Sequence, residues 1–398
     1  GMLDESAPTQ PINIRRRAVF VLPGYDPAPP RRYREIYRRE AALQGIVTGQ
    51  SLTLSAAERP APFYGWQVKS STGTVTDFWL LPWNDLVRSS ISAGVFGIYA
   101  LAGRAALTYL RGGAFFALLR LRWQPMLAVL YPLAILLAQI LIAVGLVALG
   151  AEILGPIGAA IGACLAYAGA EALRRRDARH YTYYLLHLYA FAAQNAAQPN
   201  AELTQRMRAF SREVQSALAD GVDEVLIVGH SLGAQLAVDL LADMLRRGQL
   251  PGCGRVGLLT LGQVIPMISF LPSAKQLRRN LHDLAASDHV FWLDVSSQAD
   301  GGCFALADPV AVTGISPARP FGPKVISAAF SETVTGSDKQ RFFDRHFQYY
   351  KAFARPEKYD YFALTAGDIS LEDRFSGRNN SPQLNQKIYS KQTDMADE

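Results

Sequence analysis

The stretch that decides the fold is Val225-Leu226-Ile227-Val228-Gly229-His230-Ser231-Leu232-Gly233-Ala234-Gln235-Leu236-Ala237. A β-branched apolar run is followed by the pattern Gly-x-Ser-x-Gly and then by apolar residues at helical spacing. This order predicts a buried strand, a tight turn and a helix, with Ser231 on the turn. A serine hydroxyl is a poor nucleophile, so it needs a turn that presents it to a base, and flanking glycines permit that strained backbone. Ser231 is therefore the expected nucleophile.

Strand-like and helical segments alternate on both sides of this turn. Short apolar or alternating runs predict strands at residues 18–22, 64–69, 74–81, 258–261 and 290–295. Helical patterns cover residues 181–195, 201–219 and 274–286. Alternation of this kind predicts an α/β fold in which helices flank a mostly parallel sheet.

The sequence GHSLG at residues 229–233, followed by a helix of small residues, resembles the α/β-hydrolase superfamily. It is most similar to the lipase and esterase members of that superfamily, and the resemblance covers about residues 18–85 and 200–365. The resemblance implies an α/β-hydrolase-type sheet, with a nucleophile, an acid and a histidine in that chain order. It also implies an oxyanion hole made of two backbone amides.

The histidine implied by that order is His346. The chain has six histidines, and His346 is the only one downstream of the strand-like run and its following loop. An aromatic residue, Phe347, comes directly after it, as is frequent in the histidine loop of the family. We therefore expect His346 to be the general base that takes the proton of Ser231.

Three carboxylates compete for the role of the acid. Residues 262–282 contain none, so the loop after the strand at 290–295 has to supply it. Asp294 lies within the strand-like run and Asp308 precedes a proline. Asp300 lies in Gln-Ala-Asp-Gly-Gly, a turn that can direct a carboxylate toward an imidazole N–H. Asp300 is the expected acid, and Asp308 is the alternative.

The oxyanion hole implied by the resemblance uses the amides of Leu232, directly after the nucleophile, and Tyr25, in the turn after the first strand. That turn reads Pro-Gly-Tyr-Asp, whereas the family often has His-Gly there. The sequence has no phosphate-binding loop, no dinucleotide fingerprint and no Cys/His cluster. We therefore expect neither a cofactor nor a metal.

An apolar insertion interrupts the α/β pattern between residues 90 and 179. Residues 126–150 contain no charged side chain, and residues 153–170 form a second apolar stretch rich in Gly and Ala. The two stretches predict a helical hairpin at about 126–172 that spans a membrane. A pair of buried helices in a soluble cap is the alternative. Arginines lie at both outer ends and none lies near the tip, which places the outer ends and the catalytic domain on the cytoplasmic side; they are Arg120, Arg122 and Arg174–Arg176.

Residues 91–119 form a weaker apolar segment that glycines interrupt. Arg104 and Arg111 lie seven residues apart in it and therefore on one helical face. This pattern is typical of an interfacial or re-entrant membrane helix, and equally of an amphipathic lid helix that rests on the protein core.

The expected organisation is a hydrolase core at residues 12–89 and 180–366, the insertion at 90–179 and a loose polar tail at 367–398. Of the 398 residues, 49% are hydrophobic and 19% are charged, which excludes a disordered chain. The net charge of +6 is too dilute to indicate nucleic acid, and three scattered cysteines indicate no disulfide framework.

Together these patterns predict a membrane-associated serine hydrolase that cleaves a lipid or another hydrophobic acyl ester through Ser231, His346 and Asp300. Two alternatives stay open at this point. An acyltransferase would use the same three residues with an alcohol or amine acceptor, and a catalytically inactive hydrolase fold would serve as a membrane scaffold or lipid carrier.

Overall fold

The computed structural model describes residues 13–24, 29–58, 63–89, 94–177, 182–252, 254–330 and 342–398. Its centre is an eight-stranded sheet in the order β2-β3-β4-β1-β5-β6-β7-β8. The strands at the β2 edge pair antiparallel, and all pairs from β4 to β8 are parallel. The strands are β1 (Arg16–Leu22), β2 (Leu52–Ala56), β3 (Tyr64–Ser70), β4 (Val75–Leu80), β5 (Glu224–His230), β6 (Val256–Leu261), β7 (Phe291–Ser296) and β8 (Lys324–Ser327).

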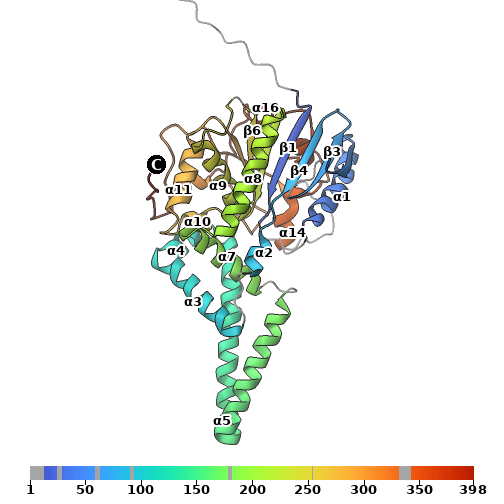
Figure 1. Ribbon diagram of the computed structural model, residues 1–398. Helices are drawn as coiled ribbons and strands as arrows, with labels where there is room; N and C mark the ends of the chain where they lie inside the picture. The colour runs from blue at the N-terminus through green and yellow to red at the C-terminus, as the bar shows by residue number, and fades with distance from the viewer. Residues whose placement is uncertain are drawn as a thin grey trace, which may run out of the picture.

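Helices cover both faces of this sheet (Figure 1). Alternate residues of a strand point to opposite faces, so Phe20 and Ile227 enter one apolar core while Val21 and Val228 enter the other. Strands buried on both faces read as continuous apolar runs, which is why β1 and β5 are easy to find in the sequence. The first core packs against α8 (Ala201–Ala219), α9 (Gly233–Arg246) and α11 (Lys275–Ala285), and the second against α1 (Arg31–Thr48), α15 (Tyr361–Ala366) and α16 (Leu371–Phe375).

The insertion between β4 and β5 forms its own group of helices below the sheet (Figure 1). The expected helix at 91–119 is broken at Gly112 and Gly113, where Gly113 has a φ of 71°. The helices are α2 (Asn84–Ser89), α3 (Val95–Arg111), α4 (Ala114–Leu121), a short 3-10 turn (Gln124–Met126), α5 (Leu127–Arg175) and α7 (Thr182–Ala197).

Helix α5 is a hairpin of two antiparallel arms that extends away from the sheet (Figure 1). The chain reverses at Gly155, whose φ of 64° and ψ of −145° are not helical, close to the tip expected near Glu152. A Cβ at Gly158 would collide with the Gly150 carbonyl, and one at Gly162 with the Leu146 carbonyl. Glycines at these two levels therefore let the arms approach each other closely.

The surface of this hairpin is apolar and largely uncovered. Leu141, Val144 and Ile157 are 64%, 62% and 71% exposed. Among the described residues, the segment Gln124–Arg175 is long and apolar enough to cross a membrane. Since the hairpin does not fold back over the sheet, burial inside a soluble cap is not what the structure has (Figure 1).

The C-terminal segment after residue 366 was expected to be loose, but it is bound along the domain. Ile369 and the Gly367 carbonyl lie against Arg17, whose guanidinium also forms an ion pair of 2.6 Å with Glu224 in the buried interior. Farther on, the Arg278 guanidinium donates to the Asp394 carbonyl. Backbone carbonyls make most of these contacts, and backbone groups leave no signature in a polar sequence.

Candidate active site

Ser231 lies at the turn between β5 and α9, as the sequence predicts for a strand-turn-helix. Its φ is 56°, a left-handed conformation that is uncommon for a residue with a side chain. The helix begins so close to β1 that a Cβ at Gly233 would collide with the Leu22 carbonyl. The turn is therefore held by its neighbours in a conformation that costs free energy, which is typical of functional residues.

His346 and Asp300 are in direct contact. The Nδ1 of His346, on α14 (Phe342–Phe347), lies 2.9 Å from Oδ2 and 3.1 Å from Oδ1 of Asp300. Both side chains are almost completely buried, at 6% and 0% exposed. Because a carboxylate accepts, Nδ1 carries the proton, so Nε2 of the neutral imidazole is the nitrogen that can accept one.

Asp300 is held by two further donors. The Gly302 amide donates to Oδ1 at 2.8 Å, and the Tyr349 hydroxyl donates to Oδ2 at 2.9 Å. Burial acts to raise the pKa of Asp300, but the charge and hydrogen bond of His346 and these two donors outweigh it, so the pKa lies below its usual range. The carboxylate is therefore ionised at neutral pH and can orient the imidazole and stabilise its protonated form.

His230 connects the turn that carries Ser231 to the segment that carries His346. Its Nε2 donates to the His346 carbonyl at 2.6 Å, and the centroids of the two rings lie 4.7 Å apart. Burial, with a smaller contribution from His346, lowers the pKa of His230 to about 3. His230 therefore stays neutral and fixes the backbone of His346.

His230, next to Ser231 in the chain, contacts the His346 ring, but among the described residues no hydrogen bond joins Ser231 Oγ to that ring. Contacts between a nucleophile and its base are often loose without substrate and tighten when it binds. Ser231 is only 5% exposed, so a substrate has to displace part of its cover to reach it.

The two competing carboxylates have other partners. Oδ1 of Asp308 accepts from the amides of Val310 and Ala311, so Asp308 is the N-cap of α12 (Pro309–Thr313). Asp294 lies inside β7, where Thr260 donates to it at 2.5 Å. Burial raises the pKa of Asp294 to about 8. Of the three candidates, Asp300 is the one in contact with His346.

Leu232, the first expected oxyanion donor, follows Ser231 directly and is the N-cap residue of α9. A Cβ at Gly24 would lie 2.7 Å from the Ser231 Cβ and 3.0 Å from the Leu232 nitrogen, so the turn after β1 begins against the same point. Tyr25, the second expected donor, lies outside the described residues.

Sequence reasoning missed Tyr349. This residue binds two residues of the segment 297–308 between β7 and α12, which carries Asp300 and is called the acid loop below. Besides donating to Asp300, its hydroxyl accepts from the Ser297 amide at 3.0 Å, and its own carbonyl accepts from Tyr359 at 2.6 Å. Its position three residues after His346 is the one signal that the sequence offers. Nothing in the sequence shows that the side chain turns back toward Asp300.

The acid loop is also bound to the base of the hairpin. Arg122, just before the turn that leads into α5, donates to the Cys303 carbonyl at 3.2 Å and to the Gln298 carbonyl at 2.9 Å. These two carbonyls lie on either side of Asp300 in the chain. The candidate site therefore lies at the edge of the sheet that faces the hairpin, where the parallel strands end (Figure 1).

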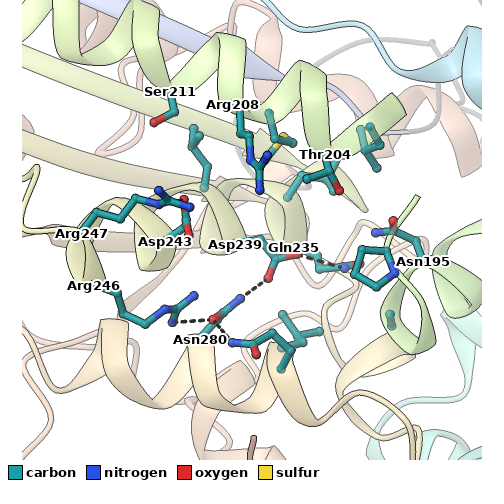
Figure 2. A pocket seen from close by; sticks show the side chains of 18 residues that line it. Asn195, Thr204, Arg208, Ser211, Gln235, Asp239, Asp243, Arg246, Arg247 and Asn280 are labelled. Carbon is teal, nitrogen blue, oxygen red and sulfur yellow. Dashed lines mark hydrogen bonds and ion pairs between the residues drawn. The ribbon is translucent and has the colours of Figure 1, made fainter. Parts of the chain in front are cut away.

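A separate cavity of about 240 Å³ lies farther along α9, between this helix, α8 and α11. Asn280 donates to Asp239 at 2.7 Å and accepts from Arg246 at 2.8 Å, as Figure 2 shows. Burial raises the pKa of Asp239 to about 6. Ser231, His346 and Asp300 do not line this cavity, so it is distinct from the candidate site.

Within the described ranges, no group of three or more His, Cys, Asp or Glu side chains is arranged to hold a metal ion. In comparisons with known proteins, no family model matches the chain, and no curated protein and no solved structure matches it. The α/β fold with its eight-stranded, mostly parallel sheet is therefore the level at which the architecture is established, and the function has to be argued from the site.

Proposed function

We propose that the protein is a membrane-anchored serine hydrolase with an α/β-hydrolase-type core that cleaves lipid or other hydrophobic acyl esters. The observation that carries the proposal is the buried Asp300–His346 pair beside a strand-turn-helix that holds Ser231 at a positive φ. An ionised carboxylate, an imidazole with a free Nε2 and a strained serine are the groups that acyl transfer through a serine requires.

In the proposed reaction, Ser231 Oγ attacks the acyl carbonyl carbon while His346 Nε2 takes the hydroxyl proton. The negative charge that develops on the carbonyl oxygen is stabilised by the Leu232 amide and the positive end of α9. His346 then gives its proton to the leaving alcohol, and an acyl-enzyme remains. Water, deprotonated by His346, attacks this ester, releases the carboxylic acid and restores the serine.

The membrane part of the proposal is supported by the hairpin. The 19 residues of its second arm, from Pro156 to Arg174, correspond to about 28 Å of helix, close to the thickness of about 30 Å of a hydrocarbon core. With arginines at its outer ends, the α/β domain lies on the cytoplasmic side. Because Arg122 holds the acid loop against the hairpin base, the site lies near the membrane surface, where a lipid ester is available.

The test is labelling of membranes with a fluorophosphonate probe, which reacts covalently with an activated serine. The full-length protein should be labelled and retained in the membrane pellet. Ser231→Ala should lose labelling and keep membrane retention, whereas Ser211→Ala, which removes a buried serine of α8, should retain both. No labelling of the unmodified protein would refute the catalytic proposal, and recovery in the soluble fraction would refute the membrane anchor.

A further inference from the structure

A second cavity, of about 430 Å³, lies between α3 and α7 close to the base of the hairpin. Its walls are mostly apolar and small, with Leu101 and Ala105 from α3 and Ala190 and Ala193 from α7. Ser231, His346 and Asp300 are not among its lining residues. The cavity is therefore a groove with room for a ligand that is separate from the candidate active site.

Two arginines of α3, Arg104 and Arg111, line the same groove. They lie seven residues apart, which places them about 10 Å from each other along one side of the helix. Both are exposed, and neither guanidinium has a hydrogen-bond or ion-pair partner within the described part of the chain. Guanidinium groups recognise phosphate through paired N–H donors, so the two side chains can bind one phosphate group between them.

A third cation lies at the same end of α3. A Cβ placed at Gly113 would lie 3.8 Å from the ammonium nitrogen of Lys391. This lysine belongs to the C-terminal segment, which is bound near α3 through Gln392 and the Gly112 carbonyl. The polar rim of the groove is therefore positively charged, whereas its floor is apolar.

The contact of α3 with the hairpin indicates where the groove lies along the length of the hairpin. The Phe96 ring stacks on the Tyr167 ring of α5, with centroids 6.1 Å apart. Arg104 follows Phe96 by eight residues and Arg174 follows Tyr167 by seven, distances of about 12 and 10 Å along the two helices. Both helices run from this contact toward the sheet, so Arg104 and Arg174 lie on the sheet side of it, toward the end of the apolar arm (Figure 1).

We propose that the groove between α3 and α7 binds an anionic membrane phospholipid, with its phosphate between Arg104 and Arg111 and an acyl chain along the apolar floor. The inference rests on the membrane anchoring in the proposed function, but not on the catalytic role of Ser231. Charge complementarity and the position toward the end of the apolar arm both favour a phospholipid as the occupant.

The test is native mass spectrometry of the full-length Ser231→Ala protein in detergent, so that no lipid is hydrolysed. The probes are phosphatidylglycerol, phosphatidylcholine and inorganic phosphate, each titrated separately. Phosphatidylglycerol should bind more tightly than phosphatidylcholine. Arg104→Ala and Arg111→Ala should each weaken it about fivefold, the factor expected for one arginine at an anionic surface, and the double variant about 25-fold.

Arg120→Ala is the matched control, because it removes an exposed arginine of α4 that does not line the groove. It should leave the affinity for phosphatidylglycerol unchanged. Ala105→Phe keeps both groove arginines and fills the apolar floor, so it should also weaken lipid binding.

Equal affinity for the two lipids, or an equal loss in Arg120→Ala, would overturn the proposal. Displacement of the lipid by inorganic phosphate at equal concentration would overturn the assignment to a phospholipid. Each of these outcomes can be distinguished from failure of the proposed function, because membrane retention and fluorophosphonate labelling are measured separately, on the protein with Ser231 intact.

Discussion

Replacing Asp300 by Asn is the perturbation that tests the candidate site most directly. The carboxylate accepts from His346 Nδ1, the Gly302 amide and the Tyr349 hydroxyl. An Asn side chain has one acceptor oxygen, and two donors already compete for it. Its NH₂ group would then face Nδ1, which moves the imidazole proton to Nε2, the atom that has to receive the proton of Ser231.

The expected loss is large, because Asn removes both the correct tautomer and the charge that stabilises the imidazolium. Loss of the equivalent carboxylate in a serine protease, a known example, lowers kcat about 10⁴-fold, and we expect a loss of about 10³ to 10⁴ here. That factor corresponds to about 4 to 5 kcal/mol of transition-state stabilisation. The variant should fold normally, since Asp and Asn are nearly equal in size.

The assay is the rate of fluorophosphonate labelling and the release of fatty acid from a short-chain ester by membranes that contain the protein. Asp308→Asn is the matched control. Asp308 caps α12, and Asn caps helices as well as Asp does, so the control should keep both stability and rate. If Asp300→Asn retained more than a tenth of the rate, or Asp308→Asn lost as much, the assignment of the acid would be wrong.

Three further predictions concern stability. Asp294→Asn should raise the free energy of unfolding by up to about 4 kcal/mol at pH 7. Between about pH 4 and 8 the buried Asp294 carboxyl keeps a proton that it lacks in the unfolded state, and this difference destabilises the native protein. Asn has no such proton to bind. The gain should shrink toward pH 4 in urea titrations, and a gain independent of pH would contradict this explanation. Glu224→Ala leaves the buried Arg17 guanidinium without its ion-pair partner and should cost about 3 to 5 kcal/mol in urea unfolding. Replacing Arg17 by Met as well should recover only part of this loss, because the Gly367 and Ile369 carbonyls then lose their donor. Gly158→Leu should lower the melting temperature in detergent because it separates the hairpin arms, whereas Gly169→Leu, which faces open space, should not; equal effects would exclude close packing of the arms.

The sequence predicts the centre of the sheet better than its edges. β5 and β6 are buried on both faces, so their apolar runs are continuous and short, as in other parallel strands. β2, at one edge, is largely exposed, and β8, at the other, has four residues. An exposed or very short strand carries little hydrophobic pattern, which is why both were missed.

In the candidate site, the features that the sequence predicts depend on the local pattern or on chain order, and the features that it misses depend on contacts between distant segments. The turn at Ser231 is encoded by adjacent residues, and chain order alone selects His346. The support of Asp300 by Tyr349 and of His346 by His230 depends on segments that fold back from a distance. Such contacts have no fixed spacing, so a single sequence cannot reveal them.

The position of the insertion explains why one chain combines this site with a hairpin. It leaves the sheet after β4 and returns before β5, and the carboxyl ends of parallel strands share one edge of a sheet. Ser231 follows β5 at that edge, and Arg122 holds the acid loop there through two carbonyls. A hairpin inserted at the opposite edge of the sheet would lie far from Ser231 and Asp300. Its present place keeps Asp300 close to the base of the hairpin, because Arg122 binds the carbonyls of Gln298 and Cys303 on either side of Asp300.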